Sequence, residues 1–293
     1  MKKTNRYQLG LEITTDDVSL IGMDHHKRIT GLAALPYAGI LKDGVEPDID
    51  KFDSCILELS HYLPLSSGRL SIGLPINTIL HSHFTLNEII PEQEQAHFNQ
   101  WTAQFFTNSP PKAFHQFCRL DIQSDPHHYD CYFLRHKILD SLNDIALRHD
   151  LSLSFVGLTI QRLFHTIQEK NPPLFDRNLL FVHGHCSSFS ILCWYNHQTE
   201  HYFTLPACPS DQLGQEINDQ LFTYNLQPDL FDLAVFCGDF EMQTIIRPVL
   251  KNQMAKDFLA IDIMDYLTLS DGIRSQLDNH DKLQSFIGAF SLL

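Results

Sequence analysis

The same short design occurs once in each half of the chain, and this repetition constrains the fold more than any other sequence feature. Residues 10–20 and residues 180–192 each alternate apolar side chains, pass through a polar turn and then resume the apolar pattern. Such alternation on both sides of a polar turn predicts a β-hairpin. A recurring supersecondary unit indicates an internal duplication. We therefore expect an α/β protein built from two related halves.

Apolar periodicity predicts the remaining elements. In the first half it predicts helices over 48–62, 135–148 and 160–167, and strands over 69–74, 79–86, 114–122, 130–134 and 151–156. In the second half it predicts strands over 179–182, 189–194, 202–205, 233–236 and 258–263, and helices over 210–224, 241–254 and 282–293. Pro91 opens a further expected helix, residues 92–106, with an aromatic stripe at Trp101, Phe105 and Phe106.

Consecutive prolines at Pro172 and Pro173 cannot continue a helix, so they mark the best domain boundary. We expect an N-terminal lobe over residues 1–170, with an inserted subdomain at about 78–134, and a C-terminal lobe over residues 171–293.

Composition excludes several classes of protein. The net charge of −14 disfavours binding to nucleic acid, which is itself a dense anion. The seven cysteines are odd in number and form no Cys-x-x-Cys pair, which argues against a disulfide framework and fits a reducing cytosol. No apolar stretch reaches the 18 or so residues of a membrane span. We expect a soluble cytoplasmic protein that reaches a membrane only through a partner.

Several segments, taken in order, resemble one known family. Residues 10–19 lie on a strand–turn–strand signature. Residues 129–134 and 147–151 match a strand, a long helix and a turn into a further strand. Residues 205–217 feed a helix, and residues 235–239 fall at an adenosine-loop position. Phe84-Thr85-Leu86, Pro91 and Trp101 follow the same plan. In this order and spacing the chain resembles the PilM family of type IV pilus assembly proteins, including its MshI-like and HofM-like members.

The resemblance implies an actin-like, two-lobed α/β fold with duplicated ribonuclease-H-like subdomains and a small inserted α+β subdomain. It implies a scaffold at the cytoplasmic face of the inner membrane, in a type IV pilus, an MSHA-like pilus or competence machinery. The implied partner is a PilN-like single-pass inner-membrane protein, whose short N-terminal peptide would enter a groove and pair with a sheet edge. The formation of homo-oligomers is also left open. We expect neither nucleic-acid binding nor direct insertion into the membrane.

The chain departs from the family where a nucleotide would bind. Glu12 replaces an aspartate, Thr14 replaces a glycine, and Asp16 adds negative charge next to the phosphate position. In the second hairpin His183 stands for an aspartate and His185 for a glycine. A Cβ at a phosphate-contacting glycine obstructs the backbone's approach.

We therefore expect a degenerate nucleotide cleft, a pseudo-ATPase without catalytic residues, and no cofactor, with ATP and Mg²⁺ bound weakly or not at all. Its residues are Glu12, Thr14, Thr15, Asp16, His183, His185, Ser187, Ser188 and Gly238.

Other interpretations stay open at this point. The chain could be an active ATP-binding protein or a kinase of the same fold. Cys186 could be the nucleophile of a hydrolase with His183 as its base. His183, His185 and Cys186 could together bind a metal, with both histidines on one face of a strand. We expect no metal, because 17 histidines make such a cluster easy to obtain by chance. Glu12, Asp16 and Asp17 could be paired acid/base carboxylates, but solvated turn residues are the favoured interpretation.

Overall fold

The computed structural model describes residues 7–36, 39–42, 46–63, 67–86, 114–121, 127–254, 256–266, 269–270, 273 and 284–293. By the contacts between residues the chain forms a larger unit, Met1–Thr78 with Leu142–Leu293, and a smaller unit, Ile79–Ser141. The boundary expected at residue 170 lies inside the larger unit, and the division into lobes 1–170 and 171–293 stays a prediction.

The first sheet of the larger unit is built around the first predicted hairpin. Its strands are β1 (Gln8–Ile13), β2 (Asp17–Met23), β3 (Ile29–Pro36), β6 (Arg69–Leu74) and β10 (Ser152–Leu158), in the order β10-β6-β1-β2-β3. β1 pairs with β2, and β2 with β3, in antiparallel fashion. β1 pairs with β6, and β6 with β10, in parallel.

The second sheet repeats this topology. Its strands are β11 (Leu179–His185), β12 (Ser188–Tyr195), β13 (Gln198–Pro206), β14 (Leu233–Gly238) and β15 (Asp257–Ala260), in the order β13-β12-β11-β14-β15. The β11–β12 and β12–β13 pairs are antiparallel, and the β11–β14 and β14–β15 pairs are parallel. The expected duplication and the α/β class are therefore confirmed.

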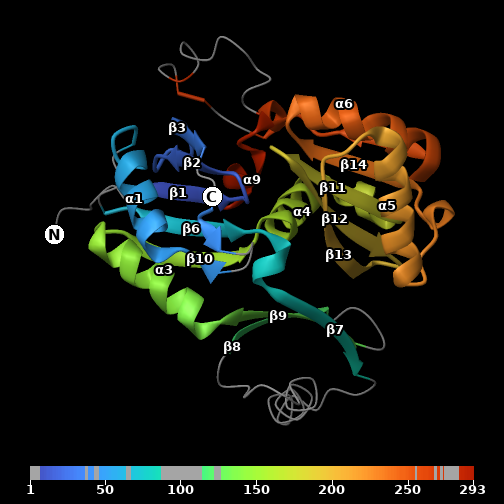
Figure 1. The fold of residues 1–293 in the computed structure, drawn as a ribbon, viewed down its shortest axis with the longest axis horizontal. Coiled ribbons are helices and arrows are strands. Elements are labelled where there is room, and N and C mark those ends of the chain that lie inside the picture. Colours follow the sequence, from blue (N-terminus) through green and yellow to red (C-terminus); the bar gives the residue numbers. More distant parts are fainter. Residues whose placement is uncertain are drawn as a thin grey trace. The chain divides into compact units, whose positions relative to one another are not determined.

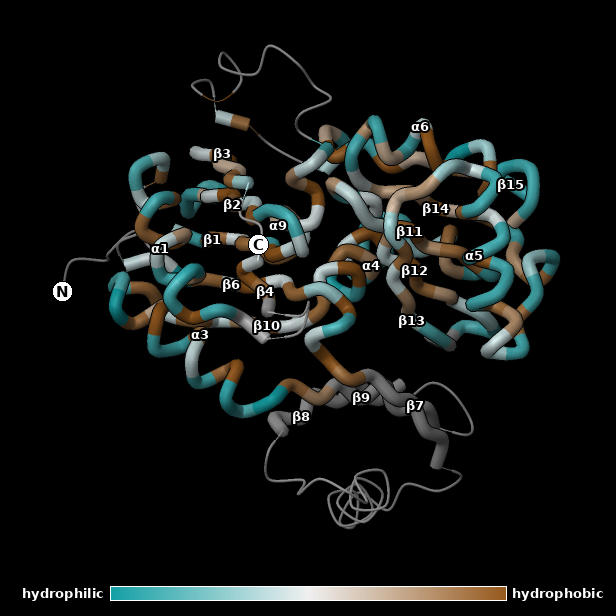
Figure 2. Tube along the Cα trace, in the orientation of Figure 1, coloured by the Kyte–Doolittle hydropathy of each residue, from teal (hydrophilic) through white to brown (hydrophobic). Residues whose placement is uncertain are grey.

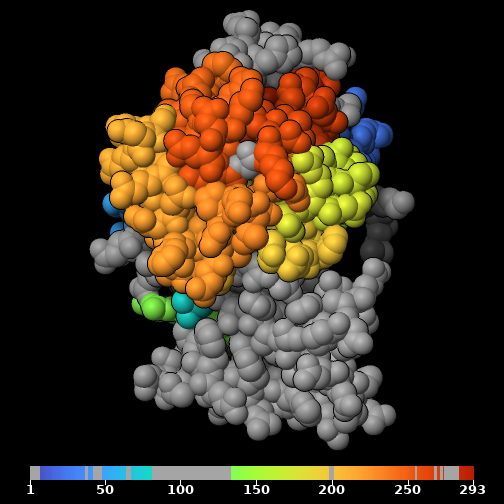
Figure 3. Space-filling model, turned by 90° about the vertical axis from the view of Figure 1, so that its right-hand side faces the viewer, coloured from blue at the N-terminus to red at the C-terminus, as the bar shows by residue number. Residues whose placement is uncertain are grey.

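Amphipathic helices cover these sheets (Figure 1). They are α1 (Ile49–Leu59), α3 (His136–Arg148), α4 (Thr159–Lys170), α5 (Ser210–Thr223), α6 (Phe240–Val249) and α9 (Ile287–Ser291). α4 and α9 contact each other and strands of both sheets, and they lie between the sheets in Figure 1. α5 and α6 pack together over the second sheet and form much of the face seen in Figure 3.

The apolar stripe of each helix meets the apolar strands. Phe52, Cys55, Ile56 and Leu59 of α1 are buried, and Ile160, Leu163, Phe164 and Ile167 of α4 are buried. The alternation of apolar and polar residues along the helices is visible in Figure 2. This matches the helical spacing of apolar residues in the sequence. Within the described residues no helix is both long and apolar enough to cross a membrane.

Short elements complete the larger unit. They are β4 (Leu41–Lys42), β5 (Glu46–Pro47), η1 (Ile76–Thr78), η3 (Pro172–Asp176), η4 (Pro228–Leu230), η5 (Leu250–Met254) and η6 (Ile263–Asp265).

Two C-terminal helices differ from the prediction. The helix expected over 241–254 stays α-helical to Val249 and continues as the π-helical η5, since Pro248 removes a backbone donor within it. Of the helix expected over 282–293, the described part is helical at Gln284 and at Ile287–Ser291, with a turn at residues 285–286 between them. Phe286 and Leu292 are buried.

The smaller unit contains an antiparallel sheet in the order β7-β9-β8, formed by β7 (Leu80–Leu86), β8 (Phe114–Asp121) and β9 (His127–Arg135). The strands predicted over 114–122 and 130–134 are confirmed, and they pair with each other. His127 and His128, which precede the strand predicted over 130–134, already belong to β9, where His127 lies opposite β7 and His128 lies opposite both β7 and β8. The expected helix 92–106, with Trp101, Phe105 and Phe106, lies outside the described residues.

Candidate functional site

The turns of the two duplicated hairpins meet and bond to each other. His185 Nε2 lies 3.1 Å from Asp17 Oδ1, and the thiol of Cys186 donates to Asp17 Oδ2 over 2.9 Å. The hydroxyl of Ser187 donates to Asp16. The first strand of each hairpin ends at this point, so the duplicated topology brings the two turns together.

The end of β14 completes this cluster. β14 pairs with β11 in parallel, with Gly238 opposite Gly184. The next residue, Asp239, accepts a hydrogen bond from the backbone N–H of Cys186 over 2.8 Å, and its carboxylate lies 3.2 Å from His185 Nδ1. The imidazole of His185 is therefore held between two carboxylates, one on each ring nitrogen.

The surroundings of His185 favour its charged form. Burial by itself would lower the pKa of His185, but the hydrogen bonds to Asp17 and Asp239 outweigh it and raise the pKa well above 6.5. For Asp17 and Asp239, burial opposes the charged form, yet the hydrogen bonds to His185 hold both pKa values below 3.8. An imidazolium between two carboxylates thus links the two sheets.

A second pair, Glu12 and His183, lies deeper and is uncharged. Glu12 is 2% exposed and His183 4% exposed, and His183 Nδ1 lies 3.6 Å from Glu12 Oε1. Burial raises the pKa of Glu12 to about 8. Burial, followed by repulsion from the charged His185, lowers the pKa of His183 to about 3. Glu12 therefore carries its proton at neutral pH, and His183 is neutral.

The expectation that Glu12 is a solvated turn residue is wrong. Glu12 belongs to β1 rather than to the turn, and α9 covers it, so that a Cβ added at Gly288 would lie 2.0 Å from Glu12 Oε2. Asp17, the third member of that set, is also partly buried, because the second hairpin closes over it; Asp16 is exposed.

The buried pair borders a small cavity of about 40 Å³. Four buried polar atoms without a hydrogen-bond partner belong to residues that line it: Glu12 Oε2, His183 Nε2, Thr159 Oγ1 and Thr204 Oγ1. A polar cavity of this size holds a water molecule, and buried polar groups normally have such a partner.

The titration of Glu12 makes stability depend on pH. In the folded protein Glu12 keeps its proton up to about pH 8, whereas the unfolded group loses it near pH 4.5. Unfolding between these values releases a proton, so stability falls as pH rises. Glu12→Gln cannot titrate, so relative to wild type it should gain on the order of 3 kcal/mol between pH 5 and pH 8. Urea unfolding of both proteins at the two pH values measures this gain.

The exposed Glu58 on α1 offers the matched control, Glu58→Gln, which removes a carboxyl group that is not buried. If the difference in stability between Glu12→Gln and wild type is the same at both pH values, Glu12 is ionised in the folded protein.

The structure brings together all nine residues assigned to the cleft from the sequence. Thr14, Glu12, His183 and His185 are buried, Thr15, Asp16 and Ser187 are exposed at the turns, and Ser188 lines the cavity. Gly238 has φ +131°, and a Cβ added there would lie 1.9 Å from Gly184 O. The backbone geometry at this position therefore requires a glycine. The rings of His183 and His185 stack 6.1 Å apart, as expected for one face of a strand.

Two central residues were missing from that set. Asp17 and Asp239 supply both carboxylates around His185. The sequence gives only a weak signal for these two residues: Asp17 directly follows Asp16, and Asp239 directly follows Gly238, both of which are assigned to the cleft.

These residues do not fit a magnesium-bound nucleoside triphosphate in the observed geometry. A phosphate-binding turn needs free backbone N–H groups. Here Thr14 Oγ1 accepts from the N–H groups of Asp16 and Asp17, and Asp239 accepts from that of Cys186. The carboxylates of Asp17 and Asp239 add negative charge. A cavity of about 40 Å³ is also far below the roughly 300 Å³ at which small-molecule pockets begin.

The surroundings of Cys186 argue against a cysteine nucleophile. Burial and the neighbouring Asp17 raise the pKa of the thiol, although His185 opposes them. An activated cysteine requires the opposite shift. His183, the proposed base, is buried beside Glu12, and burial lowers its pKa to about 3, which is too low for a base at neutral pH.

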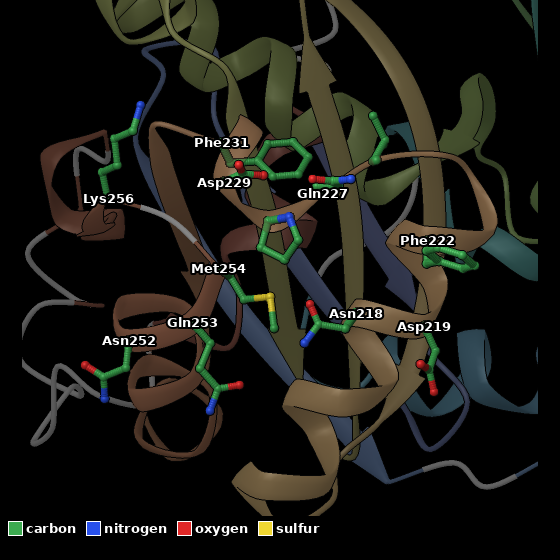
Figure 4. Close-up of a pocket in the computed structure, with 12 residues that line it drawn as sticks. Asn218, Asp219, Phe222, Gln227, Asp229, Phe231, Asn252, Gln253, Met254 and Lys256 are labelled. Carbon is green, nitrogen blue, oxygen red and sulfur yellow. The ribbon is translucent and has the colours of Figure 1, made fainter.

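A larger pocket of about 670 Å³ lies elsewhere on the second half of the chain (Figure 4). The segments 218–231 and 252–256 line it, and its buried wall is formed by Leu226, Phe231 and Met254. It contains neither histidine nor cysteine, and its exposed residues are mainly amides and aspartates.

Similarity to known proteins is structural only. No protein-family model matches the sequence, and no curated protein matches it. A chain of the PilM–PilN type IV pilus biogenesis complex superposes with a TM-score of 0.78 at 12% identity, covering 99% of this chain and 98% of that chain.

Two further structures share the fold. A Bacteroides thetaiotaomicron protein with an actin-like ATPase fold and unknown function gives a TM-score of 0.54 at 11% identity, over 94% of this chain and 97% of that chain. The ethanolamine utilization protein EutJ from Carboxydothermus hydrogenoformans gives 0.51 at 10% identity, over 99% and 91%. The protein has a PilM-like, actin-like fold.

Proposed function

We propose that this protein is a scaffold of a type IV pilus machinery that binds the cytoplasmic N-terminal peptide of a PilN-like inner-membrane protein without needing a nucleotide. The likeness to the PilM–PilN complex carries the first part of the proposal. It spans almost the whole of both chains, and the larger unit and the smaller sheet are both included in that coverage.

The bonding of the two turns supports the second part. The groups that would meet a triphosphate are already bonded to one another, with His185 as the internal cation and Asp17 and Asp239 as the internal anions. A nucleotide would have to break these bonds before it gained any contact. The free energy spent on breaking these bonds would lower the affinity for the nucleotide.

Calorimetric titration with a synthetic N-terminal peptide of the PilN-like protein from the same organism tests the proposal. We expect saturable binding, with the same Kd in the absence and in the presence of Mg-ATP. A scrambled peptide of the same composition is the control. Absence of binding under both conditions would overturn the scaffold proposal.

Nucleotide dependence would instead favour the active ATP-binding alternative. A ligand present at 100 times its Kd stabilises the folded state by about 2.7 kcal/mol. Such a ligand raises the thermal unfolding midpoint. Because we expect no productive nucleotide binding, millimolar Mg-ATP should leave the midpoint unchanged. A clear upward shift would refute the proposal that the bonds among His185, Asp17 and Asp239 exclude the nucleotide.

A further inference from the structure

We propose that Asp17, His185 and Cys186 form a zinc-binding site that cross-links the two hairpin turns. One donor atom of each residue lies within 4.8 Å of the other two. Carboxylate oxygen, imidazole nitrogen and thiolate sulfur are all accepted zinc ligands, and thiolate with imidazole favours zinc over magnesium or calcium. This set differs from the one that the sequence alone suggests, because Asp17 takes the place of His183, which is buried beside Glu12.

The neighbours of these three residues act as supports for the ligands. A metal-binding histidine usually donates its second ring N–H to a carboxylate, which fixes the tautomer and the ring orientation. Asp239 lies 3.2 Å from His185 Nδ1 and leaves Nε2 for the metal. The hydroxyl of Thr14 donates to Asp17 Oδ1 over 2.7 Å and holds that carboxylate in place.

The backbone at Cys186 is also unusual. Cys186 has φ +51°, a left-handed conformation that non-glycine residues rarely adopt. In this conformation its sulfur lies 2.9 Å from Asp17 Oδ2. Residues in such conformations gather at ligand-binding sites, where the surrounding structure holds them.

Zinc binding at this site requires no reactant other than the ion, because the ion displaces protons. Zinc would replace two protons, one on His185 Nε2 and one on Cys186 Sγ, and both would leave to solvent. The added double positive charge equals the positive charge removed, so the net charge of the cluster does not change. His185 is 5% exposed in its side chain and Cys186 is exposed, so the ion would have solvent on one side and a water molecule as its fourth ligand.

Cobalt substitution tests the site directly. The metal-free protein, held under reducing conditions, is titrated with Co²⁺ and its absorption spectrum is recorded. We expect one Co²⁺ per chain with a thiolate-to-metal charge-transfer band, and Zn²⁺ should displace it. Cys186→Ser should abolish the band, whereas Cys208→Ser, at another partly accessible free cysteine, should leave it unchanged.

A supporting residue gives an independent measurement. Asp239→Asn should weaken Zn²⁺ binding by about 10- to 100-fold while keeping the band, because it acts through His185. Zn²⁺ should also raise the unfolding midpoint of wild type but not that of Cys186→Ser. Absence of the band in wild type, its survival in Cys186→Ser, or Co²⁺ binding without a thiolate band would each overturn the site.

Discussion

Replacing His185 with alanine is expected to lower the free energy of unfolding by about 3–5 kcal/mol, because it removes one partner of a buried ion pair. Asp17 and Asp239 would lose their shared cation, and both would remain largely enclosed. Chemical denaturation of wild type and variant measures the loss. A metal chelator is present, so that bound metal does not contribute to the measured free energy of unfolding.

Two further variants sharpen this result. His25→Ala changes an exposed histidine in the β2–β3 turn and should alter stability by no more than about 0.5 kcal/mol. Combining His185→Ala with Asp17→Asn should recover part of the loss, since one unpaired charge is then removed. If His185→Ala unfolds at the same denaturant concentration as His25→Ala, the imidazolium does not link the sheets.

Replacing Gly238 with alanine is expected to have a comparably large effect for a different reason. An added Cβ would lie 1.9 Å from Gly184 O and 2.8 Å from Gly184 C, both backbone atoms of the paired strand. The φ of +131° is also a conformation that L-residues rarely adopt. Backbone strain and overpacking together should cost about 3 kcal/mol or more, seen as a lower denaturation midpoint or as loss of folded protein.

Gly157→Ala is the matched control on a parallel strand. The three atoms nearest to its added Cβ all belong to the ring of Phe155, the end of a side chain that is 36% exposed, rather than to the backbone. A cost of about 1 kcal/mol is expected there. Equal costs at the two positions would show that the contact between β14 and β11 is not what requires Gly238.

The sequence predicted the repeated strands well because their signal is local. A strand with one face in the core shows apolar alternation wherever it lies in the chain, and the polar turns at 14–17 and 185–188 interrupt that alternation. Errors arose where local signals were ambiguous. His127 and His128 follow an Asp-Pro pair, a sequence typical of turns, yet both belong to β9 and pair with neighbouring strands. Pro248 ends the α-helix earlier than its apolar residues suggest.

Most members of the candidate site were predictable from the sequence, but Asp17 and Asp239 were not assigned to it, and the protonation states were not predictable. Thr14 and His185 were assigned as obstructed glycine positions, and the structure shows that they bond within and between the turns. Nothing local to Glu12 indicates that α9, from the far end of the chain, covers it. Desolvation by such distant segments sets the pKa of a buried group, and it cannot be derived from neighbouring residues alone.

The sequence by itself determined the duplicated α/β architecture and the segments that surround the cleft, because apolar periodicity and turn chemistry are properties of short stretches. Only the tertiary structure decided that Asp17 and Asp239 share His185 as their cation, and that Glu12 and His183 are neutral. Those outcomes depend on distances of a few ångströms between residues far apart in the chain. They also depend on the exclusion of water, which only the packed sheets and helices provide.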